Sequence, residues 1–154
     1  MKDLTAKDLM TQPAVTVTAD ASLAEVAQLM LARAIGSVLV TNARGELVGI
    51  VTESDFCAKS TPIPFSAFRA PQVLGHWLGR EGVEPIYQAA RQRPIGEVMT
   101  RRVFAVHPDD PLRVVLELML ARDIKHVPVV EGRRPTGLIS RHDVLKLVLD
   151  QVRA

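Results

Sequence analysis

The sequence predicts an α/β (α+β) protein made of two β-α-β-β-α units, packed with pseudo-twofold symmetry into one module with a partly helical insert between them. Two observations predict this fold. The sequence repeats itself once, and each copy alternates strand-like and helix-like apolar patterns in the same order. A unit of about 50 to 60 residues buries too little surface to be robust alone, so we expect the two copies to share one core.

One internal repeat spans most of the chain. When Met10 is placed on Met99, an offset of 99 − 10 = 89, fourteen of the thirty-one positions from 10 to 40 are identical, including the unbroken run LMLAR. One deletion in a later turn changes the offset to 137 − 49 = 88, and GIVTESD at 49–55 then aligns with GLISRHD at 137–143. Agreement over this length indicates a duplication.

The duplication divides the chain into three parts. The first repeat takes residues 1–58, an insert takes residues 59–93, and the second repeat takes residues 94–154. Apolar spacing within the insert predicts two short helices, near 73–78 and 85–93. The insert either covers an edge of the module or serves as a lid or partner surface.

The first copy begins with a helical turn, a strand and a longer helix. Thr5-x-x-Asp8 is a capping box before the turn, and alternation at 15–17 predicts the strand. Ser22-x-x-Glu25 is a second capping box, which predicts the start of the longer helix. The spacing i, i+3, i+4, i+7, i+8 predicts the buried stripe of that helix: Leu23, Val26, Ala27, Met30 and Leu31.

A hairpin and a final helix complete the first copy. Strands are predicted at 37–41 and 46–52, on either side of a turn at 42–45 that contains Gly45. The final helix begins at Glu53 or the next residue.

The second copy follows the same order. Asp110-Pro111 predicts an N-cap residue followed by proline at the first helical position. Strands are predicted at 126–130 and 136–140, and a final helix from Arg141. The longer helix repeats the apolar stripe, with Leu112, Val115, Leu116, Met119 and Leu120.

Composition excludes several classes of protein. Hydrophobic residues make up 47% and charged residues 23%, no apolar run approaches 18 residues, and the first residues are too polar for a secretory signal, so we expect a cytoplasmic protein without membrane contact. Cys57 is the only cysteine, which excludes an internal disulfide and favours an inert side chain. The balance of 19 Lys and Arg against 17 Asp and Glu argues against nucleic-acid binding. The four histidines lack metal-ligand spacing, so we expect no metal.

GIVTESD and GLISRHD each allow two interpretations. Each ends a strand and starts a helix, so each fits the acidic form of a capping box: Thr52 with Asp55, and Ser140 with Asp143. The same groups suit a ligand, because a helix N-terminus attracts phosphate and an ionised carboxylate accepts hydrogen bonds from ribose hydroxyls. The glycine that opens each motif is expected where main chain approaches closely. The two interpretations are compatible.

Several motifs recur in one order along the chain. They are the openings DLMT and EVMT, the strand IKHVPVV of the second copy, and the ending G-h-h-[ST]-x-x-D of both copies. Together, over residues 4–58 and 94–151, they resemble tandem cystathionine-β-synthase (CBS) domains, and the chain looks like a bacterial stand-alone CBS pair, or Bateman module. The resemblance implies two clefts at the seam between the repeats, which bind adenine nucleotides or related ligands, usually in a dimer.

The resemblance also implies particular contacts. The segment Val127-Pro128 matches the adenine-lining segment of the family, and the first copy departs from it. The strands around Thr16 and Ala105 match the family strand whose main chain meets the adenine.

Cationic residues gather only near the second motif. They are Lys125, His126, Arg141 and His142, and they favour a phosphate-bearing ligand there, the alternative being a solvated face. Glu53 stands at the matching position of the first copy and disfavours dense negative charge.

These observations favour a regulatory module and not an enzyme. We expect it to bind AMP, ADP, ATP or a related ligand, to need no cofactor beyond that regulatory nucleotide, and to pass occupancy to an unknown regulated protein. We expect a homodimer through the Leu- and Met-rich helices. The alternative is a dimeric scaffold or interaction protein whose clefts stay empty. A hydrolase using Asp55 or Asp143 is disfavoured because no nucleophile–base pair is visible.

Overall fold

The computed structural model describes residues 4–57 and 91–152. The first helix predicted inside the insert, residues 85–90 of the second, and the prediction made for the side chain of Cys57 lie outside the described part.

The first repeat contains the elements that its sequence predicts. In chain order these are α1 (Ala6–Leu9), β1 (Thr16–Thr18), α2 (Leu23–Arg33), β2 (Ser37–Thr41), β3 (Leu47–Thr52) and α3 (Glu53–Cys57). β2 is the central strand of the sheet, parallel to β1 and antiparallel to β3. Gly45 turns the β2–β3 hairpin with a φ of +76°, a conformation that glycine adopts without steric cost.

The second repeat has the same order with a reduced first strand. Its elements are η1 (Ile95–Glu97), α7 (Leu112–Arg122), β4 (His126–Glu131), β5 (Arg134–Ser140) and α8 (Arg141–Val152). β4 and β5 form an antiparallel pair. Among the described residues, the position that matches β1 makes only a single parallel bridge, Val106 to Val129, in place of a full strand.

Four of the five helix starts discussed from the sequence form their predicted caps. The carboxylate of Asp8 accepts the backbone N–H of Thr5 at 2.9 Å, and that of Glu25 accepts the backbone N–H of Ser22 at 2.7 Å. The GIVTESD and GLISRHD caps also form and are described with the site below.

The predicted N-cap at Asp110 is wrong. α7 begins at Leu112, and Pro111 is its N-cap residue, without a side-chain hydrogen bond. The carboxylate of Asp110 instead accepts the backbone N–H of His107 at 2.7 Å, which stabilises the turn before the helix. The carboxylate of Asp110 therefore stabilises the loop turn at residues 107–110 and does not cap α7.

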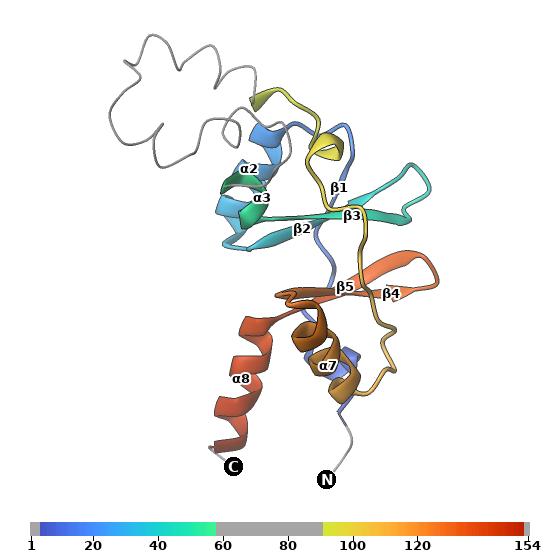
Figure 1. The fold of residues 1–154 in the computed structure, drawn as a ribbon, viewed down its shortest axis with the longest axis vertical. Helices are drawn as coiled ribbons and strands as arrows, with labels where there is room; N and C mark the ends of the chain where they lie inside the picture. The colour runs from blue at the N-terminus through green and yellow to red at the C-terminus, as the bar shows by residue number, and fades with distance from the viewer. Residues whose placement is uncertain (1–3, 58–90, 153–154) are drawn as a thin grey trace, which may run out of the picture.

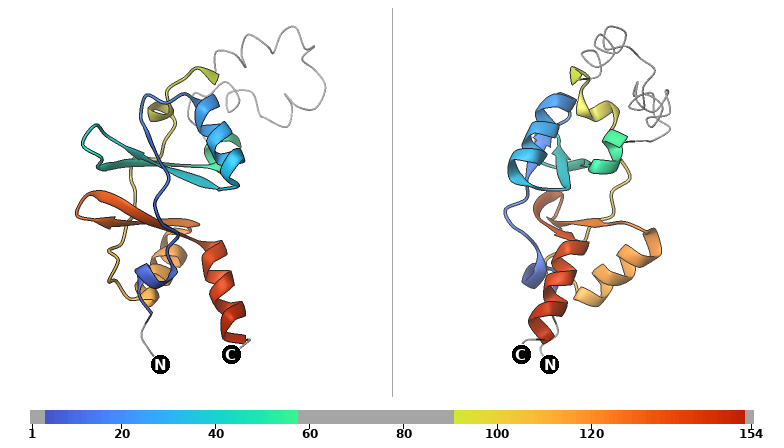
Figure 2. Two further views of the ribbon diagram at one scale, coloured as in Figure 1. Left: turned by 180° about the vertical axis from the view of Figure 1, so that it is seen from behind. Right: turned by 90° about the vertical axis from the view of Figure 1, so that its left-hand side faces the viewer.

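The two sheets face each other across the middle of the molecule, and the helices lie on the outer sides (Figures 1 and 2). Strand alternation explains this layering. In β2, Val38 and Val40 belong to the buried cluster with α2, whereas Leu39 lies on the other face, toward the second repeat. In β4, Val127 and Val129 likewise pack with α7.

The opening segments of the two repeats are exchanged. α1 packs into the cluster of the second repeat through Ala6, and η1 packs into that of the first repeat through Ile95 (Figure 1). The main chain repeats the exchange: the N–H of Ala6 donates to the carbonyl of Asp110 at 2.9 Å, and that of Ile95 to the carbonyl of Ala21 at 2.7 Å. Most of the buried apolar side chains among the described residues form two separate clusters, one on the helical side of each sheet, so the expectation of one shared core is wrong.

Each motif glycine receives a methionine from the opposite repeat. A Cβ added to Gly49 would lie 2.9 Å from Cγ of Met99, and one added to Gly137 would lie 2.9 Å from Cγ of Met10. We expected main chain to approach these glycines closely; a side chain does so. Because these two positions carry no side chain, they leave room for the methionines of the exchanged segments.

The helical stripes are narrower than predicted. Leu23, Val26 and Met30 are buried in α2, but Leu31 is 82% exposed, and its counterpart Leu120 is 80% exposed. Both leucines follow the buried methionine by one residue, about 100° around the helix, which turns them away from the sheet.

Candidate functional site

Two clefts lie at the seam between the repeats, and each combines one repeat's motif with the other repeat's opening segment. Cleft A contains the β3–α3 motif and residues 100–104, and encloses about 330 Å³. Cleft B contains the β5–α8 motif and residues 11–15, and encloses about 590 Å³. The exchange of opening segments therefore builds both clefts.

In cleft B, one carboxylate oxygen of Asp143 caps the start of α8, and the other oxygen makes separate contacts. Oδ2 of Asp143 accepts the backbone N–H of Ser140 at 2.8 Å and its hydroxyl at 2.6 Å. Oδ1 accepts the hydroxyl of Thr11 at 3.5 Å and lies 3.7 Å from Nζ of Lys146. Asp143 is 8% exposed and lines the cleft, so its carboxylate serves the cap and also faces the ligand space.

The equivalent cap in cleft A is set deeper. Oδ2 of Asp55 accepts the backbone N–H of Thr52 at 2.8 Å and its hydroxyl at 3.3 Å. The hydroxyls of Thr52 and Ser54 also lie 2.7 Å apart. Thr52 lines cleft A, but Asp55 is only 2% exposed and is absent from its lining.

An aromatic side chain narrows cleft A. Phe104 occupies the position that Val15 holds in cleft B. The guanidinium carbons of Arg102 and Arg122 lie 5.5 Å and 4.6 Å from the centre of its ring, within the range of cation–π attraction. Three side chains thus stabilise one another at this wall.

The clefts share one wall, made of Gly36, Glu53, Lys125 and His126. Burial lowers the pKa of His126 below its usual value, while Glu53 and Asp143 oppose the shift and Lys125 and Arg141 add to it. The shift favours the neutral imidazole, and His126 lines both clefts.

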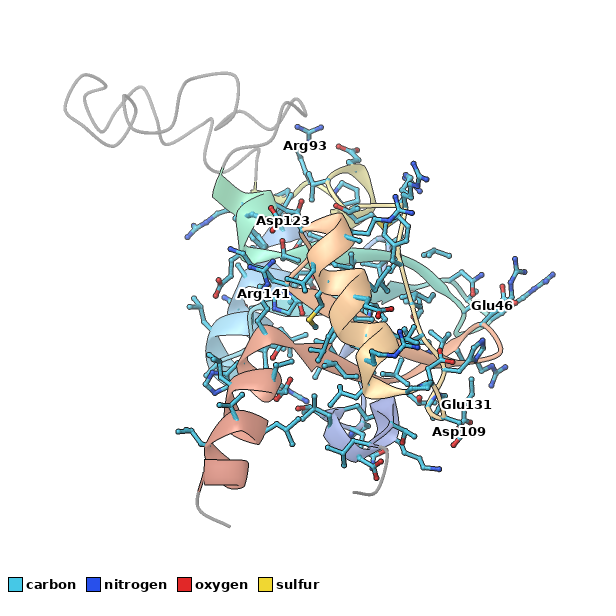
Figure 3. The ribbon with its side chains drawn as sticks, turned by 60° about the horizontal axis from the view of Figure 1, so that its bottom comes forward. Glu46, Arg93, Asp109, Asp123, Glu131 and Arg141 are labelled. Carbon is cyan, nitrogen blue, oxygen red and sulfur yellow. The ribbon has the colours of Figure 1, made fainter. Side chains whose placement is uncertain are left out.

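The charge around the two clefts differs. Cleft B brings together Lys125, Arg141 and Lys146, against the carboxylates of Glu53 and Asp143. Cleft A brings together Arg102 and Lys125, against Glu53 and Asp123. Arg141 also lies 2.9 Å from Asp123, an exposed pair that bridges the ends of α8 and α7 (Figure 3). Cleft B carries the greater positive charge.

The structure brings most of the predicted site residues to the seam. Thr52 lines cleft A, Lys125 and His126 line both clefts, and cleft B is lined by Ser140, Arg141, His142 and Asp143.

Five predicted contacts do not line either cleft: Asp55, as described above, and Thr16, Ala105, Val127 and Pro128. Val127 and Pro128 are fully buried, the former with α7, and neither lines a cleft. Thr16 lines a separate hollow beside the hairpins, and Ala105 is exposed outside both clefts. Residues just before them, such as Val15 and Phe104, provide the strand-side walls instead.

The lining residues that the sequence analysis did not propose include Ser37, Phe104 and Lys146. Ser37 aligns with His126 under the repeat offset and could have been found that way. Lys146 follows Asp143 by three residues, a spacing that places both on one helix face.

Among residues 4–57 and 91–152, no group of three or more His, Cys, Asp or Glu side chains could hold a metal ion. Within the same residues, no helix has both the length and the apolar character needed to cross a membrane.

Comparison with known proteins gives a consistent result. The family model of the CBS domain matches residues 6–60 and 95–150. The uncharacterized protein MJ1426 of Methanocaldococcus jannaschii is 29% identical over 154 residues, which cover 93% of this chain and 90% of that protein. The uncharacterized protein MJ1404 of the same organism is 28% identical over 150 residues. That alignment covers 97% of this chain but only 33% of MJ1404, so the chain spans about a third of the length of this relative.

Solved structures show the same architecture. The CBS domain of a CBS domain containing membrane protein from Sphaerobacter thermophilus is 35% identical, with a TM-score of 0.75, over 95% of this chain and 88% of that one. The CBS domain pair of protein MJ0100, in complex with 5′-methylthioadenosine and S-adenosyl-L-methionine, is 25% identical, with a TM-score of 0.70, over 96% of this chain and 98% of that one.

Proposed function

This chain belongs to the CBS domain family, and we propose that it is a regulatory module that binds an adenine nucleotide, or a related adenosine ligand, between its repeats. One observation carries the proposal: cleft B combines an apolar interior, a carboxylate at a helix start and a cationic mouth. These are the three environments that a base, a ribose and a phosphate require.

Each part of such a ligand has a matching group. The carboxylate of Asp143 can accept hydrogen bonds from ribose hydroxyls, since an ionised carboxylate is an acceptor only. The N-terminus of α8 favours an anion, and Arg141 and Lys125 add charge-assisted donors at the same end. The adenosine ligands of the MJ0100 domain pair support this class of ligand.

Cleft A suits a less charged ligand. It is smaller, its carboxylates balance its cations, and Phe104 offers an aromatic face. AMP, ADP or ATP is therefore proposed for cleft B first.

We propose that the module acts as a homodimer. Several apolar side chains on its helices are more than half exposed: Leu31, Leu120, Leu145, Val148 and Leu149. Apolar surface of this kind is typical of protein interfaces. Occupancy of the clefts would change the angle between repeats or between subunits, and a regulated protein would sense that change as a difference in affinity.

A binding role fits better than a catalytic one. The carboxylates of Asp55 and Asp143 both hold caps at helix starts. Steady turnover of any nucleotide by the purified protein would contradict this part of the proposal.

A thermal-shift and calorimetry panel tests the function. AMP, ADP, ATP, S-adenosylmethionine and 5′-methylthioadenosine are titrated into the full chain, and a ligand at 100 times its Kd should stabilise the fold by about 2.7 kcal/mol. If no member of the panel raises the unfolding temperature, the proposal fails and the scaffold with empty clefts is favoured.

A further inference from the structure

Ser37 has a buried hydroxyl that the fold leaves unpaired. The residue is 2% exposed, and among the described residues its Oγ is the only buried side-chain nitrogen or oxygen atom without a hydrogen-bond partner. Buried polar groups in proteins are almost always paired, so an orphan of this kind needs an explanation. Thr41, at the other end of the same strand, shows the ordinary case, because its hydroxyl donates to the carbonyl of Val17 at 3.5 Å.

The position of Ser37 connects the orphan hydroxyl to cleft B. Ser37 is the first residue of β2 and lines this cleft together with Leu39, two residues further on the same face of the strand. Val38, between them, packs on the opposite face with α2. Strand alternation therefore turns Ser37 toward the space between the repeats.

Cleft B is apolar inside and cationic at its mouth. Val15, Leu39 and Leu138 line it at half-buried or buried positions, whereas Lys125, Arg141 and Lys146 are exposed. A nucleotide that follows this gradient enters with its base inward and its phosphate outward, since phosphate gains most from the exposed cations. Ser37 is buried at the inner end of the gradient.

We propose that the hydroxyl of Ser37 hydrogen-bonds the base of the ligand in cleft B. A serine hydroxyl can both donate and accept, so it can pair with a ring nitrogen or with an exocyclic amino group. This inference rests on the proposed function and adds a base-contacting residue to it. His126 fills the equivalent position of the second repeat, so the contact is specific to one cleft.

The substitution Ser37→Ala separates this role from a structural one. In the full-length protein it should weaken AMP and adenosine binding, measured by calorimetry, by about 3- to 10-fold, the worth of one hydrogen bond. The unfolding midpoint without ligand should stay unchanged or rise, because the removed hydroxyl has no partner in the fold. Binding of ribose 5-phosphate, which lacks the base, should stay unchanged.

Thr41→Val is the matched control on the same strand. It removes a paired hydroxyl outside both clefts, so it should lower the unfolding midpoint and leave AMP affinity unchanged. Opposite patterns for the two variants support the role of Ser37.

The outcomes separate this inference from the proposed function. If the wild-type protein binds AMP and Ser37→Ala binds it equally well, the base contact is wrong while the function stands. An equal loss with ribose 5-phosphate would place Ser37 at the sugar or phosphate and overturn the base assignment. If the wild-type protein binds neither AMP nor adenosine, the base contact is wrong for these ligands, and the proposed function fails as well only if no other member of the panel binds.

Discussion

Clefts A and B are built from equivalent positions of one duplicated unit, yet they differ in depth, charge and wall chemistry. In cleft B the motif carboxylate of Asp143 reaches the ligand space, and in cleft A that of Asp55 does not. Arg141 at the mouth of cleft B is matched by Glu53 in the first repeat, and Val15 by Phe104 in the second. The two repeats share the same framework, meaning the backbone pairing and the glycine–methionine contacts that hold the repeats together. They differ in the side chains that line the clefts.

The main chain shows what has been kept. Thr11 and Leu138 exchange backbone hydrogen bonds of 2.9 and 3.0 Å, and the equivalent pair Thr100 and Ile50 exchange bonds of the same two lengths. Backbone pairing is indifferent to side chains, so it tolerates divergence at the cleft surface. Framework and ligand preference can therefore be perturbed separately.

The largest expected effect concerns the framework. Gly49→Ala places a Cβ against Met99, which is 8% exposed and enclosed, and should lower the free energy of unfolding by about 2 kcal/mol. Gly137→Ala meets Met10, which is more exposed and freer to move, and should cost about 1 kcal/mol. Chemical denaturation measures both values.

Double-mutant cycles test the contact partners. Met99→Ala should couple to Gly49→Ala but not to Gly137→Ala, with the reverse for Met10→Ala, since only residues in contact show interaction energies above about 0.5 kcal/mol. Additive effects in all four combinations would contradict the exchange of opening segments.

The next effect concerns ligand binding. Asp55→Ala and Asp143→Ala each remove one cap and should lower stability similarly, by about 1 kcal/mol. Only Asp143→Ala removes a carboxylate that lines cleft B, so it should weaken AMP binding by about tenfold or more, measured by calorimetry. Equal losses of affinity would remove the distinction between the clefts.

A smaller effect is expected at the aromatic wall. Phe104→Val gives cleft A the residue of cleft B and removes two cation–π contacts, which should lower the free energy of unfolding by about 1 kcal/mol. Arg122→Gln should reproduce part of that loss. AMP binding in cleft B should be unaffected, and a change there would show that the two clefts are not independent at this wall.

The smallest expected effect is the pH dependence that His126, in the wall shared by both clefts, gives to stability and to AMP affinity. Because burial holds the pKa of His126 below its unfolded value of about 6.5, its contribution to stability is full above that pH and is lost as pH falls through the lowered folded pKa. A bound phosphate would favour the protonated imidazole among its neighbours Glu53, Lys125, Arg141 and Asp143.

Affinity for AMP should therefore rise about 3-fold more between pH 7.5 and pH 6 in the wild-type protein than in His126→Gln, a comparison that cancels the titration of AMP itself. Identical pH profiles for the two proteins would exclude His126 from the phosphate environment.

The elements that the sequence predicts well are those with local causes. The capping box at Ser22 and Glu25 and the strands of both hairpins depend on neighbours within a few residues. The exchange of opening segments joins residues far apart in the sequence, from 99 − 49 = 50 positions for Gly49 and Met99 to 137 − 10 = 127 positions for Met10 and Gly137, and no local pattern predicts such a pairing. The same holds for the aromatic wall, where Arg122 of α7 meets Phe104 only in the folded chain.

In the candidate site too, features with local causes could be predicted from the sequence, and features that depend on the folded surroundings could not. The pairs at 52–55 and 140–143 could be predicted because three-residue spacing fixes a helix cap. Which carboxylate reaches a cleft depends on how deeply each helix start is buried, and spacing alone does not determine depth. The unpaired hydroxyl of Ser37 is likewise visible only once its surroundings are known.

The exchanged openings also decide when this protein can finish folding during synthesis. When the first repeat leaves the ribosome, its sheet still lacks η1 and the methionine that fills Gly49, because both lie beyond the insert. Its own opening segment, with α1, must wait longer still for β5 to be made. Neither repeat becomes a finished unit before the other, so this part of the chain completes its fold only once the second repeat has been made.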